Sequence, residues 1–184
     1  YEKRFGLKSV ELPPEGGQWL HWYVCPTTGT PLAFRPPPPH VCPAPGQALS
    51  GYPFDQVVYQ LRNDALGRAA LTLGLAYRFT NREQYAKEAA ALLTAFADRY
   101  QSWPLHDIRG KAGVNGGKAY AQTLDESIWL IKMAWTYDLV RGSGVLDAQA
   151  KAHIENDLLR ASYRTVSKAH KGPTDNIQSW INAA

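Results

Sequence analysis

The sequence is short of long apolar runs, of basic runs and of cysteine. No stretch is apolar enough to cross a membrane, so no membrane partner is expected. Neither a cluster of basic residues nor a nucleic-acid-binding motif occurs, so nucleic acid is not an expected partner. Two cysteines are too few to settle the redox compartment.

Apolar and aromatic residues, by contrast, are plentiful. Hydrophobic side chains make up 45% of the 184 residues, which is enough for the core of one domain or of part of one. Six Trp and ten Tyr are many for this length, and sugar-binding clefts as well as cores use such residues. The net charge of +4 suits an anionic partner through long-range attraction.

Residues 1–53 are expected to form an irregular N-terminal arm. Paired prolines and glycines interrupt any long helix in it. Residues 19–24 and 31–34 can pair as a small β-hairpin. The four prolines at 36–39 predict a stiff polyproline II spacer, a structural role that we favour over a ligand for an SH3-type domain.

The arm contains a short internal repeat with the pattern V-C-P-x-x-G, once at Cys25 and once at Cys42. The pattern resembles a pair of zinc knuckles, C-P-x-C-G, from which the second cysteine of each is missing. Half of the thiolate ligands of a structural zinc site are therefore absent, although His21 and His40 could complete a Cys2His2 set. A disulfide, two free thiols and a metal site all stay open, and an exported protein would favour the disulfide.

From residue 54 onward the pattern is helical. Apolar residues recur at spacings of three and four from 54 to about 79, and again from 85 to 100. Asn81-Arg82-Glu83-Gln84 between them has the form of a capping box that would start the second helix. The short connection predicts an antiparallel pair of helices.

Residues 101–118 predict a long loop that mixes Trp, His, Asp and Arg side chains. Loops of this length inside a helical domain are usually functional or disordered. We interpret this one as part of a binding mouth and take His106 and Arg109 as candidate ligand contacts.

Two further helices are expected, at about 119–140 and from Asp147 to about His170. The first is apolar on nearly all sides, which predicts burial on more than one side. The polar residues at its head, Gln122, Asp125 and Glu126, are therefore candidates for a pocket at the end of a buried helix. His153 and His170 are expected on the surface of the second.

The last residues are predicted to start another helix, which is unusually rich in amides for a surface helix. Thr174 or Asp175 can cap it after Gly172-Pro173. Asn176, Gln178, Trp180 and Asn182 then place three amides and an indole within two turns. Uncharged donors and acceptors beside an aromatic face suit a polar ligand such as a sugar.

This segment, Asn-x-Gln-Ser-Trp-x-Asn-Ala-Ala, resembles the start of an active-site helix in the heparinase II/III-like polysaccharide lyases, which include alginate and glycosaminoglycan lyases. The resemblance extends from about His21 and is best over 100–140 and 174–184. It implies that Asn176 binds the uronate carboxylate of the substrate. Many relatives have His next, where this chain has Ile177.

The resemblance also implies an all-α fold, an incomplete (α/α) toroid formed by residues 54–184. Helical hairpins with one buried and one amphipathic helix suit such a double ring, but two hairpins cannot close one. We therefore expect a fragment of a longer lyase, with the rest of the toroid and a β-sandwich domain following, and with the catalytic Tyr and His beyond residue 184. His106 and Tyr120 are poorer substitutes for these two.

The predicted function is β-elimination on a polysaccharide that contains uronic acid, either alginate or a glycosaminoglycan, by a secreted or periplasmic protein. No cofactor is required for this chemistry, although a structural metal ion in the arm stays open. Asn176 is the candidate catalytic residue. Candidate substrate contacts are Gln122, Glu126, Gln178, Trp180, His106 and Arg109.

Two other functions compete with this prediction. A non-catalytic carbohydrate-binding module would use the same aromatics and amides. A glycosidase would need an acid and a second carboxylate on either side of one bond, and Asp107, Asp125 and Glu126 could supply them.

Overall fold

The computed structural model describes residues 1–36, 39–43, 46–168 and 176–184, and this part of the chain is mostly α-helical, as predicted. The expected cap at Thr174 or Asp175, His170, and two prolines of the 36–39 run lie outside the described residues. No helix in the described ranges has both the length and the apolar character needed to cross a membrane. The main helices are α2 (Phe54–Thr80), α3 (Glu83–Tyr100), α4 (Thr123–Val140), α5 (Ala148–His153), α6 (Arg160–Ser167) and α7 (Asn176–Ala183).

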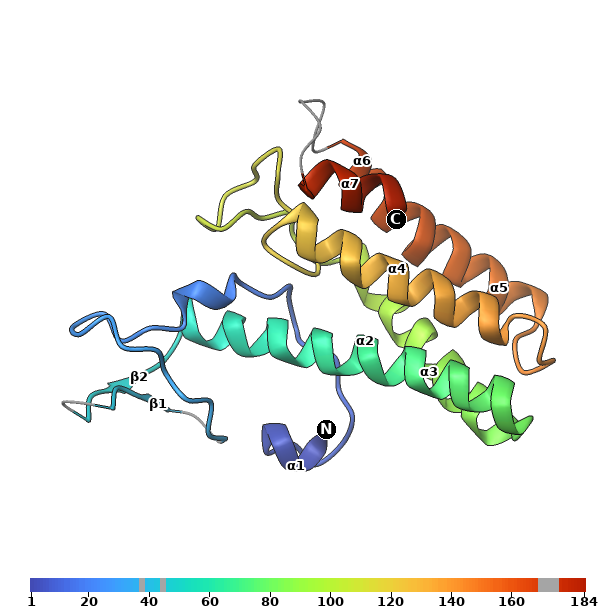
Figure 1. Cartoon of the computed structure of the whole chain (residues 1–184), viewed down its shortest axis with the longest axis horizontal. Coiled ribbons are helices and arrows are strands. Elements are labelled where there is room, and N and C mark those ends of the chain that lie inside the picture. The colour runs from blue at the N-terminus through green and yellow to red at the C-terminus, as the bar shows by residue number, and fades with distance from the viewer. Residues whose placement is uncertain (37–38, 44–45, 169–175) are drawn as a thin grey trace.

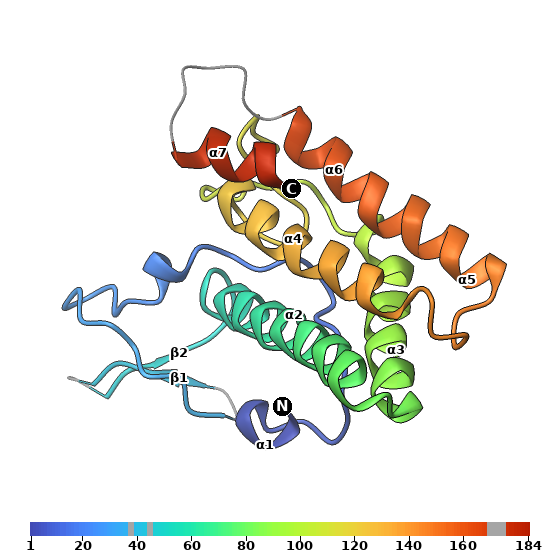
Figure 2. The same cartoon turned by 45° about the vertical axis from the view of Figure 1, so that its right-hand side comes forward.

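The helices form two layers (Figures 1 and 2). α4 lies between α2 and α7, and these three helices run in the same direction. α3 and the α5–α6 rod return on the other side and pack against one another. The N-terminal ends of α2, α4 and α7 therefore lie at one end of the molecule, where the long loop also lies.

The α2–α3 hairpin forms as predicted, but its turn works differently from the expected capping box. Asn81 adopts a left-handed conformation, with φ 53°, and its N–H donates to the Tyr77 carbonyl at 2.7 Å, so it closes α2. Arg82 precedes the first residue of α3, and no side chain caps that helix. Asn tolerates a positive φ better than most residues, and this tolerance decides its role here.

The core gathers around Trp129 of α4. Its ring stacks on Tyr100 with centroids 5.9 Å apart and meets Phe96 edge-on at 5.1 Å. A Cβ on Gly67 would lie 2.9 Å from Trp129 Cδ1, so only glycine lets α2 approach the indole this closely. The apolar helix at 123–140 is thus buried from several sides, as the sequence predicts.

α4 starts at Thr123, four residues later than predicted, and the reason is Glu126. Its fully buried Oε2 accepts the backbone N–H groups of Ala119 and Tyr120, both at 2.9 Å, and its Oε1 accepts the Tyr100 hydroxyl at 2.5 Å. The two N–H groups taken by the carboxylate hold residues 119–122 outside the helix. Burial raises the pKa of Glu126, and these hydrogen bonds oppose that rise.

The returning rod is one helix with a π-helical segment, Ile154–Leu159, between α5 and α6. Asp147 caps α5 as predicted, accepting the Ala150 N–H at 2.8 Å. His153 bridges Asp98 on α3, at 2.8 Å, and Asp157, at 2.7 Å, which raises its pKa through these two hydrogen bonds. About a third of its side chain is exposed, so this predicted surface residue also ties α3 to the rod.

The arm is held by a disulfide between Cys25 and Cys42, one of the three possibilities left open by the sequence. His40 is buried: its Nε2 is hydrogen-bonded to Asp55 Oδ1 at 2.8 Å, and its Nδ1 to the Tyr23 hydroxyl at 2.7 Å. A metal site at Cys25, Cys42 and His40, which the sequence left open, is therefore ruled out. The two sulfur atoms are joined in the disulfide, and both ring nitrogens of His40 are hydrogen-bonded within the chain. In the described ranges no three His, Cys, Asp or Glu side chains group as metal ligands.

The arm has more regular structure than predicted. A short helix, α1 (Glu2–Phe5), begins it, and strands β1 (His40–Val41) and β2 (Ala48–Leu49) pair antiparallel. Of the expected hairpin only the single bridge between Val24 and Pro31 forms, because residues 20–22 make a 3-10 turn.

We predict that Glu126→Ala lowers the free energy of unfolding by about 3 to 5 kcal/mol, because it leaves three buried donors without an acceptor. Glu126→Gln should cost about 1 to 2 kcal/mol, since its carbonyl can still accept both backbone N–H groups. Urea denaturation at 25 °C measures both. Glu88→Ala, an exposed control on α3, should change stability by less than about 0.5 kcal/mol, and an equal loss in all three variants would contradict the assigned role.

Candidate functional site

A cavity of about 280 Å³ lies where the long loop meets the first residues of α4 and α7. We call it the α4–α7 pocket. Segments far apart in the sequence thus build one cavity, as expected for a binding site. It is lined by Asp107, Ile108, Arg109, Asn115, Ala121, Gln122, Thr123, Leu124 and Ile177.

Several predicted site residues converge on this pocket. Arg109 and Gln122 line it. Asn176 is the exposed first residue of α7, directly before the lining residue Ile177. The guanidinium of Arg109 and the amide of Gln122 therefore line the cavity, and both can donate hydrogen bonds to a carboxylate.

The other candidates on α7 do not line the pocket. Gln178 Nε2 donates to Asn182 Oδ1 one turn later at 2.7 Å. Trp180 is 43% exposed, which leaves part of its indole open to a stacking partner. Both residues lie on the same eight-residue helix as Asn176.

Asp107 organises the wall of the pocket. Its Oδ1 accepts the backbone N–H groups of Arg109, at 2.8 Å, and of Lys111, at 3.0 Å. The hydrogen bond from the Lys111 N–H has the largest effect, and together with the one from Arg109 it holds the pKa of Asp107 below its usual value. Asp107 therefore stays ionised near neutral pH and does not suit the role of a general acid.

His106 and Glu126 occupy other places. The loop pairs with itself through His106 and Gly117, and His106 Nε2 lies 2.9 Å from the Gly17 carbonyl of the arm. His106 lines a separate cavity of about 220 Å³ beside Gln18 and Tyr52. Glu126 has no exposed surface, and its oxygens are used within the core. Neither side chain lines the α4–α7 pocket, so their contact with a ligand stays a prediction.

The arm supplies aromatic residues that the sequence analysis did not single out. Trp22 is 40% exposed, and its Nε1 donates to the Ile108 carbonyl at 2.6 Å. Trp19 meets Trp22 edge-on at 5.8 Å. An aromatic surface thus flanks the loop that lines the pocket, and only tertiary structure could reveal this neighbour.

Asp125 of α4 is among the candidates named from the sequence, but its neighbour Asp64 on α2 was missed. Burial first, and then the negative charge of Asp64, raise the pKa of Asp125 to about 6. The buried Tyr120 hydroxyl donates to Asp64 Oδ1 at 3.2 Å, and burial raises the pKa of this phenol. Asp125 therefore carries the properties of a weak acid near neutrality, but it does not line the α4–α7 pocket.

We predict that Asp125→Asn stabilises the protein at pH 7.5 by about 1 to 2 kcal/mol. The folded-state pKa of Asp125 lies above its usual 3.8, so deprotonation disfavours the folded state as the pH rises from about 4 to above 6. The gain should therefore shrink toward pH 4.5. Urea denaturation from pH 4.5 to 8 measures it, with Asp138→Asn on the exposed side of α4 as control. A variant less stable than the wild type at every pH would contradict the prediction.

No family model matches the sequence. The chain is 32% identical over 116 residues to an exo-oligoalginate lyase of Saccharophagus degradans, a match that covers 63% of this chain and 14% of that protein. It is 27% identical over 119 residues to an alginate lyase of Stenotrophomonas maltophilia, covering 64% and 16% respectively. The chain thus spans a small part of each relative, and these matches support a relationship with polysaccharide lyases.

Proposed function

We propose that the chain is part of an enzyme that cleaves an alginate-like polyuronate by β-elimination. The observation that carries the proposal is its similarity to two proteins named as alginate lyases. The geometry adds to it, because Arg109 and Gln122 line one pocket and Asn176 directly precedes Ile177, which lines the same pocket. The mildly basic chain, with a net charge of +4, suits an anionic polymer.

The chemistry explains why donors are needed at this place. β-Elimination removes the weakly acidic C5 proton beside a uronate carboxylate, and negative charge grows on that carboxylate in the transition state. Donors fixed around the position where charge develops lower the barrier. Asn176 supplies an amide there, at the N-terminus of α7, where the helix dipole also favours negative charge.

Arg109 and Gln122 complete the proposed site from the facing wall. Arg109 carries a permanent positive charge that can hold a second carboxylate or the same one. Gln122 is held in an extended conformation, with φ −135°, directly before α4. We propose that these two residues position the sugar while Asn176 neutralises the carboxylate.

The proton-transfer groups lie elsewhere. Of the described residues that line the pocket, only Asp107 and Arg109 ionise. Asp107 has a lowered pKa and two backbone donors on one oxygen, and Arg109 cannot give up its proton. We therefore propose that the base and the acid come from residues beyond 184, as the family resemblance implies.

We also propose the wider architecture that the resemblance implies. Parallel α2, α4 and α7 on one side and α3 with the α5–α6 rod on the other have the layering of part of an (α/α) toroid. A secreted or periplasmic location fits the Cys25–Cys42 disulfide. A glycosaminoglycan is a second possible substrate, to be compared directly with alginate.

A non-catalytic carbohydrate-binding module is the second candidate function. It is favoured by the lack of a suitable base among the described lining residues and by the exposed Trp22 and Trp180. The rise in ultraviolet absorbance of an unsaturated uronate product separates the two functions. A binding module would retain polyuronate without producing this signal.

We predict that Asn176→Ala in the complete protein lowers turnover on its best polyuronate by about 100- to 1000-fold, because a donor to the developing anion is lost. Affinity should fall less, since Arg109 and Gln122 still hold the ground-state substrate. Asn176→Asp should be worse, because it places a negative charge beside the one that develops.

The matched control is Asn156→Ala, an exposed Asn in the π-helical segment of the rod, outside the α4–α7 pocket. It should keep the turnover of the wild-type protein. Near-native turnover of Asn176→Ala would remove Asn176 from the catalytic site.

A further inference from the structure

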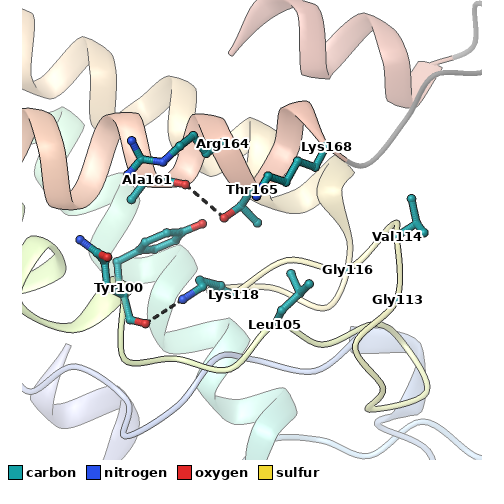
Figure 3. A pocket seen from close by; sticks show the side chains of 11 residues that line it. Tyr100, Leu105, Gly113, Val114, Gly116, Lys118, Ala161, Arg164, Thr165 and Lys168 are labelled. Atoms are coloured by element: carbon teal, nitrogen blue, oxygen red, sulfur yellow. Dashed lines mark hydrogen bonds between the residues drawn. The ribbon is translucent and has the colours of Figure 1, made fainter.

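A larger cavity, of about 400 Å³, lies between α6, the C-terminal end of α3 and the loop (Figure 3). We call it the α6 pocket. It is separate from the α4–α7 pocket, with which it shares no lining residue. It is lined by Tyr100, Gln101, Leu105, Gly113, Val114, Gly116, Lys118, Ala161, Arg164, Thr165 and Lys168.

All the charged side chains that line the α6 pocket are positive. Arg164 projects from α6, Lys168 lies one turn later at the C-terminal cap of that helix, and Lys118 lies on the loop across from them. No carboxylate is among the lining residues. Within the described part of the chain none of these three cations forms a salt bridge. An anion entering the cavity would therefore meet cations from two walls.

Of the three cations, Lys118 has the most defined position. Its Nζ donates to the Gln101 carbonyl at 2.7 Å and lies 5.8 Å from the centre of the Tyr100 ring. Burial lowers the pKa of Lys118, and the charge of Glu126 opposes that effect. Glu126 itself is enclosed in the core, where it accepts the Tyr100 hydroxyl. The ammonium is thus fixed and partly desolvated, with no carboxylate at the pocket surface to neutralise it.

The volume and the lining of the cavity favour a ligand larger than an inorganic anion. Its volume falls in the range of small-molecule sites, roughly 300 to 1,000 Å³. Leu105, Val114 and Ala161 give it apolar surface, and Thr165 donates its hydroxyl hydrogen to the Ala161 carbonyl at 3.1 Å, which leaves its oxygen as an acceptor. Cations, apolar patches and an acceptor together suit a sugar that carries a carboxylate.

The loop connects this cavity with the first one. Asn115 lines the α4–α7 pocket, whereas its neighbours Val114 and Gly116 line the α6 pocket. The loop backbone at residues 114–116 therefore contributes to the walls of both cavities. We propose that the α6 pocket is a second site for a short uronate saccharide, with Lys118, Arg164 and Lys168 binding its carboxylates; this proposal rests on the proposed function for its ligand class.

The experiment is a titration of the complete protein with a mannuronate trisaccharide, in the Asn176→Ala background to suppress turnover. Nuclear magnetic resonance of the arginine Nε–H groups reports on Arg164 directly. We expect its signal to shift, and we expect Arg164→Gln with Lys168→Gln to weaken this binding by about 5- to 20-fold, because two charge contacts are removed. Raising the salt concentration should weaken it further.

The control variant is Arg160→Gln, an exposed arginine one turn earlier on the same rod and outside the cavity, which should bind like the parent. Equal affinity for inorganic sulfate, or for neutral maltotriose, would overturn the assignment to a carboxylated sugar. An unmoved Arg164 signal would overturn the site itself. Retained turnover in Asn176→Ala, by contrast, would count against the catalytic assignment and leave this site standing.

Discussion

The buried carboxylate of Glu126 is the constraint on which the candidate site depends. It joins the end of α3, through Tyr100, to the backbone just before α4. Residues 119–122 lie outside the helix, and the carboxylate accepts the N–H groups of Ala119 and Tyr120 in this segment. Gln122 consequently faces the α4–α7 pocket, and Lys118 faces the α6 pocket on the other side. A single desolvated charge, satisfied by three donors, thus sets the path of the loop.

Periodicity predicted the helices well, because burial of an apolar stripe is a local property of the sequence. The start of α4 could not be predicted this way, since residues 119–122 contain no Gly or Pro that would exclude a helix, and the partners of Glu126 lie up to 26 residues away. Asn81 shows the same limit on a smaller scale: its side chain can cap a following helix, but its tolerance of positive φ made it the end of the preceding one.

The candidate site divides along similar lines. Sequence reasoning identified Gln122 and Arg109, which line one pocket, and Asn176, which directly precedes the lining residue Ile177, because polar groups at helix starts and in a long loop can be recognised in the sequence. It missed the contact of Trp22 with Ile108 and the coupling of Asp64 to Asp125, because each joins residues far apart in the chain. The cationic α6 pocket was missed for the same reason: Lys118 and Arg164 become neighbours only when the rod folds back.

The loop segment at residues 114–116 contributes to the walls of both cavities, so substitutions in it affect both. Val114 and Asn115 are adjacent in the backbone yet face different pockets, so a substitution at one shifts the peptide unit that positions the other. Changes made to the two cavities will therefore not combine additively, as is usual for residues in direct contact. Redesign of either pocket has to treat residues 113–118 as one unit and select variants of both walls together.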